Sequence, residues 1–292
     1  MKPPLFRYEA PRTLRDAVAV LASDPDAMVL AGGQSLVPAM NFRVATPSLL
    51  VDIQHVEGLK GIAVEDDAIV IKAMTRHREL ELHPDVRQAN PLIAETMQHV
   101  AHVPIRNRGT VVGSLCHADP SAEMPLLFVL LDGTLVATGP AGTRYIPAAD
   151  FFQSFLTTAR RQDEIVVEAR LPVLPIGAGY AFNEVTRRHG DFALVGVGCV
   201  LSLDGHGRAQ NVRLAACGIS DRPVRLKAAE AALSGSVLAA GDLAAAGRAS
   251  ADAVTQTDDM NTSMSYRRRV LSGLLQRLIP VAASRARGGK RQ

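Results

Sequence analysis

Two short segments of the chain contain the residue types that bind a diphosphate. They are residues 31–35, with the sequence AGGQS, and residues 110–114, with the sequence TVVGS. Glycine allows backbone N–H groups to come close to an oxyanion, and serine and threonine hydroxyls add hydrogen bonds without adding charge. Each segment adjoins an apolar run, and together they predict the two halves of one cradle for the pyrophosphate of a dinucleotide.

Other glycine patterns in the chain do not predict a nucleotide site. The phosphate-binding sequence GxxxxGK[ST] does not occur, which argues against a nucleotide-hydrolysing P-loop. The segment Gly196-Val197-Gly198 lacks the third glycine of GxGxxG, because Leu201 stands in its place. Since this segment lies inside an apolar run, it predicts a closely packed β-strand.

The elements around the first glycine segment predict a strand, a turn and a helix. Apolar residues at 27–31 indicate a strand, and Ser35 is placed to cap a helix that runs to about Phe42. Thr13 should cap an earlier amphipathic helix. Residues 51–53 are expected to form a second strand. A strand that leads through glycine into a helix is an arrangement suited to anions.

The following part of the chain predicts alternating hairpins and helices. Thr75 should cap a short helix, and Pro91 should begin another that includes residues 92–102. A further helix is expected at about 122–131. The predicted strands of this part are 62–64, 68–72, 134–137, 145–146 and 165–171.

Prolines and glycines between residues 172 and 179 predict a domain boundary. We therefore expect one domain at 1–175, with subdomains at about 1–56 and 57–175, and a second domain at 176–284. The second should be a small α+β domain with three strands (180–185, 193–203, 212–217) and three helices (226–233, 242–254, 266–282). Residues 285–292 are basic and are expected to form a disordered tail.

Composition limits the class of protein. Of 292 residues, 47% are hydrophobic and 21% charged, which fits a soluble globular protein, and no apolar run is long enough to span a bilayer. The three cysteines, Cys116, Cys199 and Cys217, are expected to be reduced thiols in a cytoplasmic protein. We expect no nucleic-acid binding from a net charge of +3, and no metal site in this chain.

Five segments, in order, resemble the FAD-binding medium subunit of molybdenum hydroxylases, a family represented by carbon monoxide, xanthine and nicotine dehydrogenases. They are residues 31–38 (AGGQSLVP), 50–53 (LVDI), 106–125 (RNRGTVVGSLCHADPSAEMP), 189–197 (HGDFALVGV) and 266–269 (YRRR). The resemblance covers nearly the whole chain. It implies an α+β fold: a two-part FAD-binding domain of the vanillyl-alcohol-oxidase (PCMH) type, followed by a C-terminal domain with a three-stranded sheet and three helices.

The resemblance also implies which residues contact FAD. Two segments would hold the pyrophosphate: Val29, Leu30, Ala31, Gly32, Gly33, Gln34, Ser35 and Leu36, and Thr110, Val111, Val112, Gly113 and Ser114. Glu123 would bind the adenosine ribose, and Leu171 would line the cofactor. Phe192 falls where relatives place an aromatic ring near the isoalloxazine, although a core phenylalanine is an equal alternative.

Residue 112 departs from the family pattern, because most relatives have Thr-Ile-Gly-Gly where this chain has Thr110-Val111-Val112-Gly113. A branched side chain disfavours a positive φ and a close backbone approach, so Val112 predicts weaker FAD binding or a shifted loop. Four other polar residues near or before this segment do not by themselves predict a reactive group or a metal site. His117 and Cys116 adjoin the segment without a clear role, and His99 and His102 share a predicted helix without a third ligand.

The resemblance implies an electron-transfer subunit of a heteromeric enzyme. A large partner would carry molybdopterin, a small partner [2Fe-2S] clusters, and the complex would be a dimer of heterotrimers. Electrons would reach FAD and pass to NAD, a quinone or oxygen, and no residue here is expected to act as a catalytic acid or base. Two alternatives are a stand-alone flavin oxidase and a flavin-free scaffold subunit, the latter suggested only by Val112.

Overall fold

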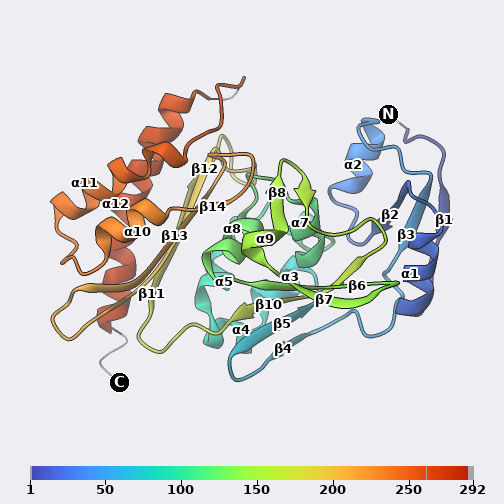
Figure 1. Cartoon of the computed structure of the whole chain (residues 1–292), viewed down its shortest axis with the longest axis horizontal. Helices are drawn as coiled ribbons and strands as arrows, with labels where there is room; N and C mark the ends of the chain where they lie inside the picture. Colours follow the sequence, from blue (N-terminus) through green and yellow to red (C-terminus); the bar gives the residue numbers. More distant parts are fainter. Residues whose placement is uncertain (1, 261, 289–292) are drawn as a thin grey trace.

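The computed structural model describes residues 2–260 and 262–288, which form three lobes side by side (Figure 1). The first lobe contains a small parallel sheet, the second a larger antiparallel sheet, and the third a sheet covered by the C-terminal helices. One hydrophobic core is continuous through the first two lobes and includes one face of the sheet of the third lobe. A second core lies between the other face of that sheet and the C-terminal helices.

The first lobe is a three-stranded parallel sheet in the order β1-β3-β2. The Thr13 hydroxyl accepts a hydrogen bond from Asp16 N at 3.1 Å, so the predicted cap begins the first helix. The elements are β1 (Arg7–Glu9), α1 (Leu14–Ala22), β2 (Ala27–Leu30), α2 (Leu36–Asn41) and β3 (Leu49–Asp52).

The second lobe is a five-stranded antiparallel sheet in the order β4-β5-β10-β6-β7, with β10 at its centre. Its strands are β4 (Ile62–Val64), β5 (Ala68–Lys72), β6 (Thr134–Gly139), β7 (Gly142–Pro147) and β10 (Ile165–Pro172). Its helices are α3 (His77–Leu82), α4 (Pro84–Ala89), α5 (Pro91–Met97), α6 (Val103–Arg106), α7 (Val111–His117), α8 (Glu123–Leu130) and α9 (Ala148–Phe151). A short hairpin, β8 (Phe152–Ser154) and β9 (Thr157–Thr158), follows α9.

The third lobe is an antiparallel sheet in the order β11-β12-β13-β14. Its elements are β11 (Gly179–Val185), β12 (Val195–Leu203), β13 (Ala209–Cys217), β14 (Val224–Arg225), α10 (Lys227–Leu233), α11 (Ala240–Ala249), a 3-10 turn (Ala251–Ala253) and α12 (Met264–Gly288). The sheet therefore has a fourth, two-residue strand beyond the three predicted.

Strand β12 explains how the second and third lobes are joined. Alternate residues such as Val197 and Cys199 belong to the core under α12, while Gly198 faces α8 of the second lobe. A Cβ on Gly198 would lie 2.6 Å from Leu130 Cδ2, so a side chain larger than hydrogen would push the helix away. The prediction that Gly196-Val197-Gly198 forms a closely packed β-strand is confirmed.

Some predicted elements differ from those observed. The Thr75 hydroxyl does not cap a helix but donates to the carbonyl of Gly61 at 2.8 Å, because the backbone turns one residue later, at Arg76. The helix expected at 92–102 ends at Met97, so His99 and His102 do not share a helix. Residues 285–288 of the expected tail belong to α12, where Arg285 pairs with Glu95, and residues 289–292 lie outside the described part of the chain.

Two further observations concern the described residues alone. All three cysteines are free thiols. Within residues 2–260 and 262–288, the helices are too short or too polar to cross a membrane.

Candidate FAD-binding site

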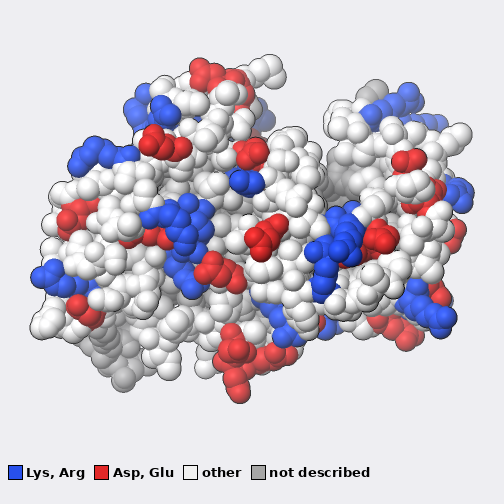
Figure 2. Space-filling view, in the orientation of Figure 1, with Lys and Arg blue, Asp and Glu red and all other residues white. Residues whose placement is uncertain are grey.

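The two glycine segments lie against each other, although about 80 positions separate them in the sequence. A Cβ on Gly32 would lie 2.5 Å from the carbonyl oxygen of Arg108, 2.8 Å from Gly109 Cα and 2.9 Å from Thr110 N. These are backbone atoms that cannot rotate away, so only glycine fits at position 32. Figure 2 shows the surface hollowed between the first two lobes, which carry α2 and α7 respectively.

The first segment presents unpaired backbone donors. Gly33 has φ +70°, a left-handed conformation that turns the chain between β2 and α2. Within the described part of the chain, the N–H groups of residues 32–35 have no hydrogen-bond acceptor. The Ser35 hydroxyl also makes no capping bond, contrary to the expectation, and is available to a ligand.

The flanking residues of this segment are partly exposed and belong to regular elements. Val29 and Leu30 end β2, Leu36 begins α2, and Ala31 and Gln34 lie between them. The Gln34 side chain donates to Gly32 O at a long 3.5 Å. The segment is thus a short turn between two fixed elements.

The second segment is the first turn of helix α7 rather than a loop. Thr110 is its N-cap, and the Thr110 hydroxyl accepts from Gly113 N at 3.2 Å. The N–H groups of Val111 and Ser114 bond to the carbonyls of Thr75 and Thr110, so among residues 111–114 the N–H of Val112 is left without a protein acceptor. A glycine-containing helix start reads like a loop in the sequence, because glycine disfavours helices.

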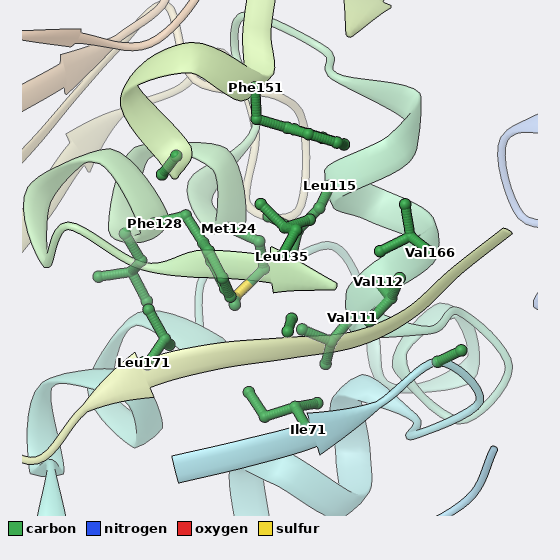
Figure 3. Close-up of a cluster of buried hydrophobic side chains, with 14 of the residues drawn as sticks. Ile71, Val111, Val112, Leu115, Met124, Phe128, Leu135, Phe151, Val166 and Leu171 are labelled. Atoms are coloured by element: carbon green, nitrogen blue, oxygen red, sulfur yellow. The ribbon is translucent and has the colours of Figure 1, made fainter. Parts of the chain in front are cut away.

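The side chain of Val112 does not face the cradle. Val112 is the second residue of α7, its φ is not positive, and it is 3% exposed. Figure 3 shows it among the buried side chains of the second lobe, near Val111 and Val166. The predicted conflict between a branched side chain and a left-handed backbone therefore does not arise at this position.

Glu123 is the first residue of α8 and is 4% exposed. Burial, followed by the negative charge of Glu184, raises the pKa of Glu123 to about 8. The carboxyl group of Glu123 is therefore mostly protonated at neutral pH in the chain without ligand. A neutral buried carboxyl can both donate and accept a hydrogen bond, as a sugar hydroxyl requires.

Leu171 and Phe192 lie in opposite environments. Leu171 is fully buried in β10 beside Phe128, so its side chain belongs to the core and does not line a surface groove (Figure 3). Phe192 is 56% exposed, which excludes the alternative of a core phenylalanine. With Phe155 it lines a cavity of about 240 Å³ beside Asp119 and Arg267.

The cradle and this cavity lie at opposite ends of α7. Residues 110–112 begin the helix, while Asp119 and Ser121 follow its end. Seven helical residues span about 10 Å, a distance that an extended dinucleotide can bridge.

Neighbouring polar residues do not form a reactive group or metal site. Burial raises the pKa of the Cys116 thiol to about 11, the opposite of what a reactive thiolate requires. Burial also lowers the pKa of His117, which keeps its ring neutral at pH 7. Among the described residues, no three histidines, cysteines or carboxylates are placed to share a metal ion.

The family of the chain follows from one comparison. The family model described as "FAD binding domain in molybdopterin dehydrogenase" matches residues 4–174, more than half of the chain. The chain belongs to the FAD-binding medium subunits of molybdenum hydroxylases. A second model, "CO dehydrogenase flavoprotein C-terminal domain", matches residues 180–281 of this medium subunit.

Individual relatives extend over almost the whole medium subunit. The 6-hydroxypseudooxynicotine dehydrogenase complex subunit alpha of Paenarthrobacter nicotinovorans is 39% identical over 99% of this chain and 98% of its own length. The nicotine 6-hydroxylase medium subunit of the same organism is 36% identical, over 98% and 100%. A carbon monoxide dehydrogenase structure from Hydrogenophaga pseudoflava matches with a TM-score of 0.95 at 35% identity, covering 98% of this chain and 99% of that one.

Two residues that support the cradle of the medium subunit were not identified from the sequence. His77 lies under Gly109, whose Cβ would be 3.0 Å from His77 Nδ1, and burial lowers the pKa of His77 to about 4. Arg106 is 6% exposed, pairs with Glu81 at 2.9 Å and donates to the carbonyls of Val100 and Ala101. Arg106 lies close to the second segment in the sequence, which is the one signal that could have identified it. The sequence of a single arginine does not show that its side chain is buried.

Proposed function

We propose that FAD lies across the junction of the first two lobes, with its pyrophosphate between Gly32-Gly33 and the start of α7. The close backbone approach at Gly32 is the observation that carries this proposal. The unpaired N–H groups of residues 32–35 and of Val112 supply donors for the phosphate oxygens, and the hydroxyls of Ser35 and Ser114 add two more. These residues fit a diphosphate group.

The remaining contacts are assigned by their position. Glu123 accepts hydrogen bonds from the adenosine ribose, and the exposed ring of Phe192 packs near the isoalloxazine. FAD supplies the ability to accept electrons singly and to release them as a pair. The task of the chain is to hold the cofactor and set its environment, and none of its residues acts as acid or base on an organic substrate.

We further propose that this medium subunit works within a larger complex. A small partner with [2Fe-2S] clusters would deliver electrons from a large molybdopterin-binding partner, and FAD would pass them to NAD, a quinone or oxygen. The relatives include a dehydrogenase complex subunit and a medium subunit, which supports such an assembly. A dimer of heterotrimers is the proposed stoichiometry.

The substitution Gly32→Ala tests the cradle. The new Cβ would meet backbone atoms of Arg108 and Gly109 at 2.5 and 2.8 Å, so the two segments must separate. We expect the flavin content of the purified chain to fall at least about tenfold, in line with the loss of more than one hydrogen bond to a charged group. The measurement is the ratio of flavin to protein absorbance after reconstitution with FAD.

A matched control is Gly273→Ala in α12, where a Cβ would meet nothing within 4 Å. It should retain the flavin content of the unaltered chain. Equal flavin content in the Gly32→Ala variant would refute the assigned cradle. A colourless unaltered chain, alone and in complex with its partners, would indicate the scaffold alternative, and substrate-dependent bleaching of the isolated chain would indicate a stand-alone oxidase.

A further inference from the structure

The turn of residues 186–194 joins β11 to β12 and brings Phe192 to the wall of the cavity. The N–H of Leu194 donates to the carbonyl of Val185 at 2.8 Å and closes the turn. The side chain of Phe192 is 56% exposed. Because the core does not surround this ring, its position depends on the conformation of the backbone that carries it.

Gly190 shapes the turn two residues before Phe192. Its φ is +84°, in the left-handed region that favours glycine. A Cβ on Gly190 would also lie 2.5 Å from His102 Cε1 and 2.8 Å from both ring nitrogens of His102. The imidazole of His102 therefore occupies the place where a side chain at position 190 would lie.

The same ring contacts the residue before Gly190. The ring centres of His102 and His189 are 5.8 Å apart and the ring planes meet at 63°, an edge-to-face arrangement that is favourable between aromatic rings. His102 belongs to the second lobe, whereas His189 and Gly190 belong to the third. The ring of His102 thus holds two consecutive residues of the turn across the boundary between the lobes.

Helix α6 fixes the backbone of His102. His102 is the N-cap residue of α6, and its carbonyl accepts from Ile105 N at 2.9 Å and Arg106 N at 3.0 Å. The guanidinium of Arg106 pairs with Glu81 at 2.9 Å and donates to the carbonyl of Ala101, just before His102, at 2.8 Å. The side chain of His102 makes no capping bond, so α6 does not depend on the ring.

The other end of α6 leads to the pyrophosphate cradle. The carbonyl of Ile105 accepts from Gly109 N at 2.7 Å, and Gly109 Cα is one of the backbone atoms against which Gly32 packs. One four-residue helix therefore adjoins the cradle at its end and carries His102, the support of the Phe192 turn, at its start.

We propose that His102 is a positioning residue for Phe192. By packing against Gly190, the His102 ring holds the turn in the conformation that places Phe192 in the wall of the cavity. The consequence for the cofactor rests on the function proposed above, in which the Phe192 ring packs near the isoalloxazine. The role of His102 is one of packing and requires neither a charge nor the transfer of a proton.

Limited digestion of the FAD-free chain with trypsin tests the contact itself. Trypsin cleaves after Arg187 and Arg188, which are exposed in the turn, and the rate of cleavage reports how often the turn opens. In His102→Ala we expect cleavage at these two sites to be at least about fivefold faster. The urea midpoint of the whole chain should not change, because His102 is exposed.

The matched control is His206→Ala, which removes another exposed histidine from the turn at the opposite end of β12. Cleavage after Arg187 and Arg188 should then be as slow as in the unaltered chain. If His102→Ala is also cleaved at the unaltered rate, the proposal is overturned.

The flavin shows whether His102 acts through Phe192. Phe192→Ala, His102→Ala and the double variant are loaded with FAD, and the visible circular dichroism of the flavin is recorded per bound flavin. We expect His102→Ala to give at least about half of the change seen in Phe192→Ala, and the double variant to match Phe192→Ala, because the ring on which His102 acts is then absent. Changes that add in the double variant would overturn the proposal, since His102 would then affect the flavin independently of Phe192.

The two measurements distinguish a failure of this proposal from a failure of the proposed function. If Phe192→Ala leaves the flavin spectrum unchanged at full flavin content, the placement of Phe192 near the isoalloxazine is wrong, while faster cleavage in His102→Ala still supports the positioning of the turn. If the chain binds no FAD, digestion of the FAD-free chain still decides the role of His102.

Discussion

The side chain and the backbone of Val112 have separate tasks. The side chain packs in the core of the second lobe, while its N–H is the unpaired donor at the start of α7. Val112→Gly should therefore lower the free energy of unfolding by about 3 kcal/mol, from lost burial and from glycine in a helix. FAD affinity of the folded variant should not change, because the N–H remains.

Urea unfolding and FAD titration of the same variant separate these effects. Val237→Ala, at a position that is 53% exposed, is the control and should change the free energy of unfolding by less than about 0.5 kcal/mol. Tighter FAD binding in Val112→Gly without a loss of stability would instead mean that the valine obstructs the cofactor.

The residue types of the cradle were predictable from the sequence, but their roles in the fold were not all predictable. Glycines and hydroxyls identified both segments, because their chemistry is local. The partners of each N–H depend on distant residues such as Thr75, so the sequence could not show that the N–H of Val112 stays unpaired while that of Val111 does not. The same holds for Leu171, whose burial follows from its place in the central strand.

At the scale of elements, the contact between α8 and β12 depends on a missing side chain. Gly198→Ala would place a Cβ 2.6 Å from Leu130 Cδ2 in a fully buried contact. We expect this overpacking to lower the free energy of unfolding by about 1–3 kcal/mol. Leu130→Ala alone should lower it by about 2–5 kcal/mol, because it leaves a cavity.

The double variant tests whether these two positions interact. The methyl group of Gly198→Ala partly fills the space left by Leu130→Ala, so the combined loss should be smaller than the sum by at least about 1 kcal/mol. Urea unfolding of the four chains gives this value. Strictly additive losses would show that the alanine is accommodated by a movement of the strand instead.

Most strands and helices were predictable because their patterns are local, whereas some of their ends were not. Alternating apolar residues marked both hairpins of the second lobe, and Thr13 and Pro91 marked helix starts. The end of α5 at Met97 has no such signal in the sequence. The strand pairing of Val224–Arg225 is set by contact with β13, which depends on the folded sheet.

For the whole molecule, burial of single titratable groups makes stability depend on pH. His77 has its folded pKa lowered to about 4, so its contribution is complete above the unfolded pKa of 6.5 and is lost as the pH falls toward 4. Glu123 has its folded pKa raised to about 8, so its contribution is complete below the unfolded pKa of 4.5 and is lost as the pH rises through 8. Between pH 4.5 and 6.5 the two effects oppose each other.

Between pH 6.5 and 8 the titration of Glu123 is the largest expected change. Histidines of the unfolded chain complete their titration in the lower part of this interval, and cysteines of the unfolded chain, whose pKa values are raised above 9 only in the folded state, begin theirs near its upper end. The FAD-free chain should therefore lose stability over this interval, by at most about 1.4 kcal/mol per pH unit. Urea unfolding at pH 6.5 and 8 measures the loss, and in Glu123→Gln it should disappear, since the amide does not titrate. A chain whose stability is constant or rises over this interval would mean that Glu123 is ionised in the folded state.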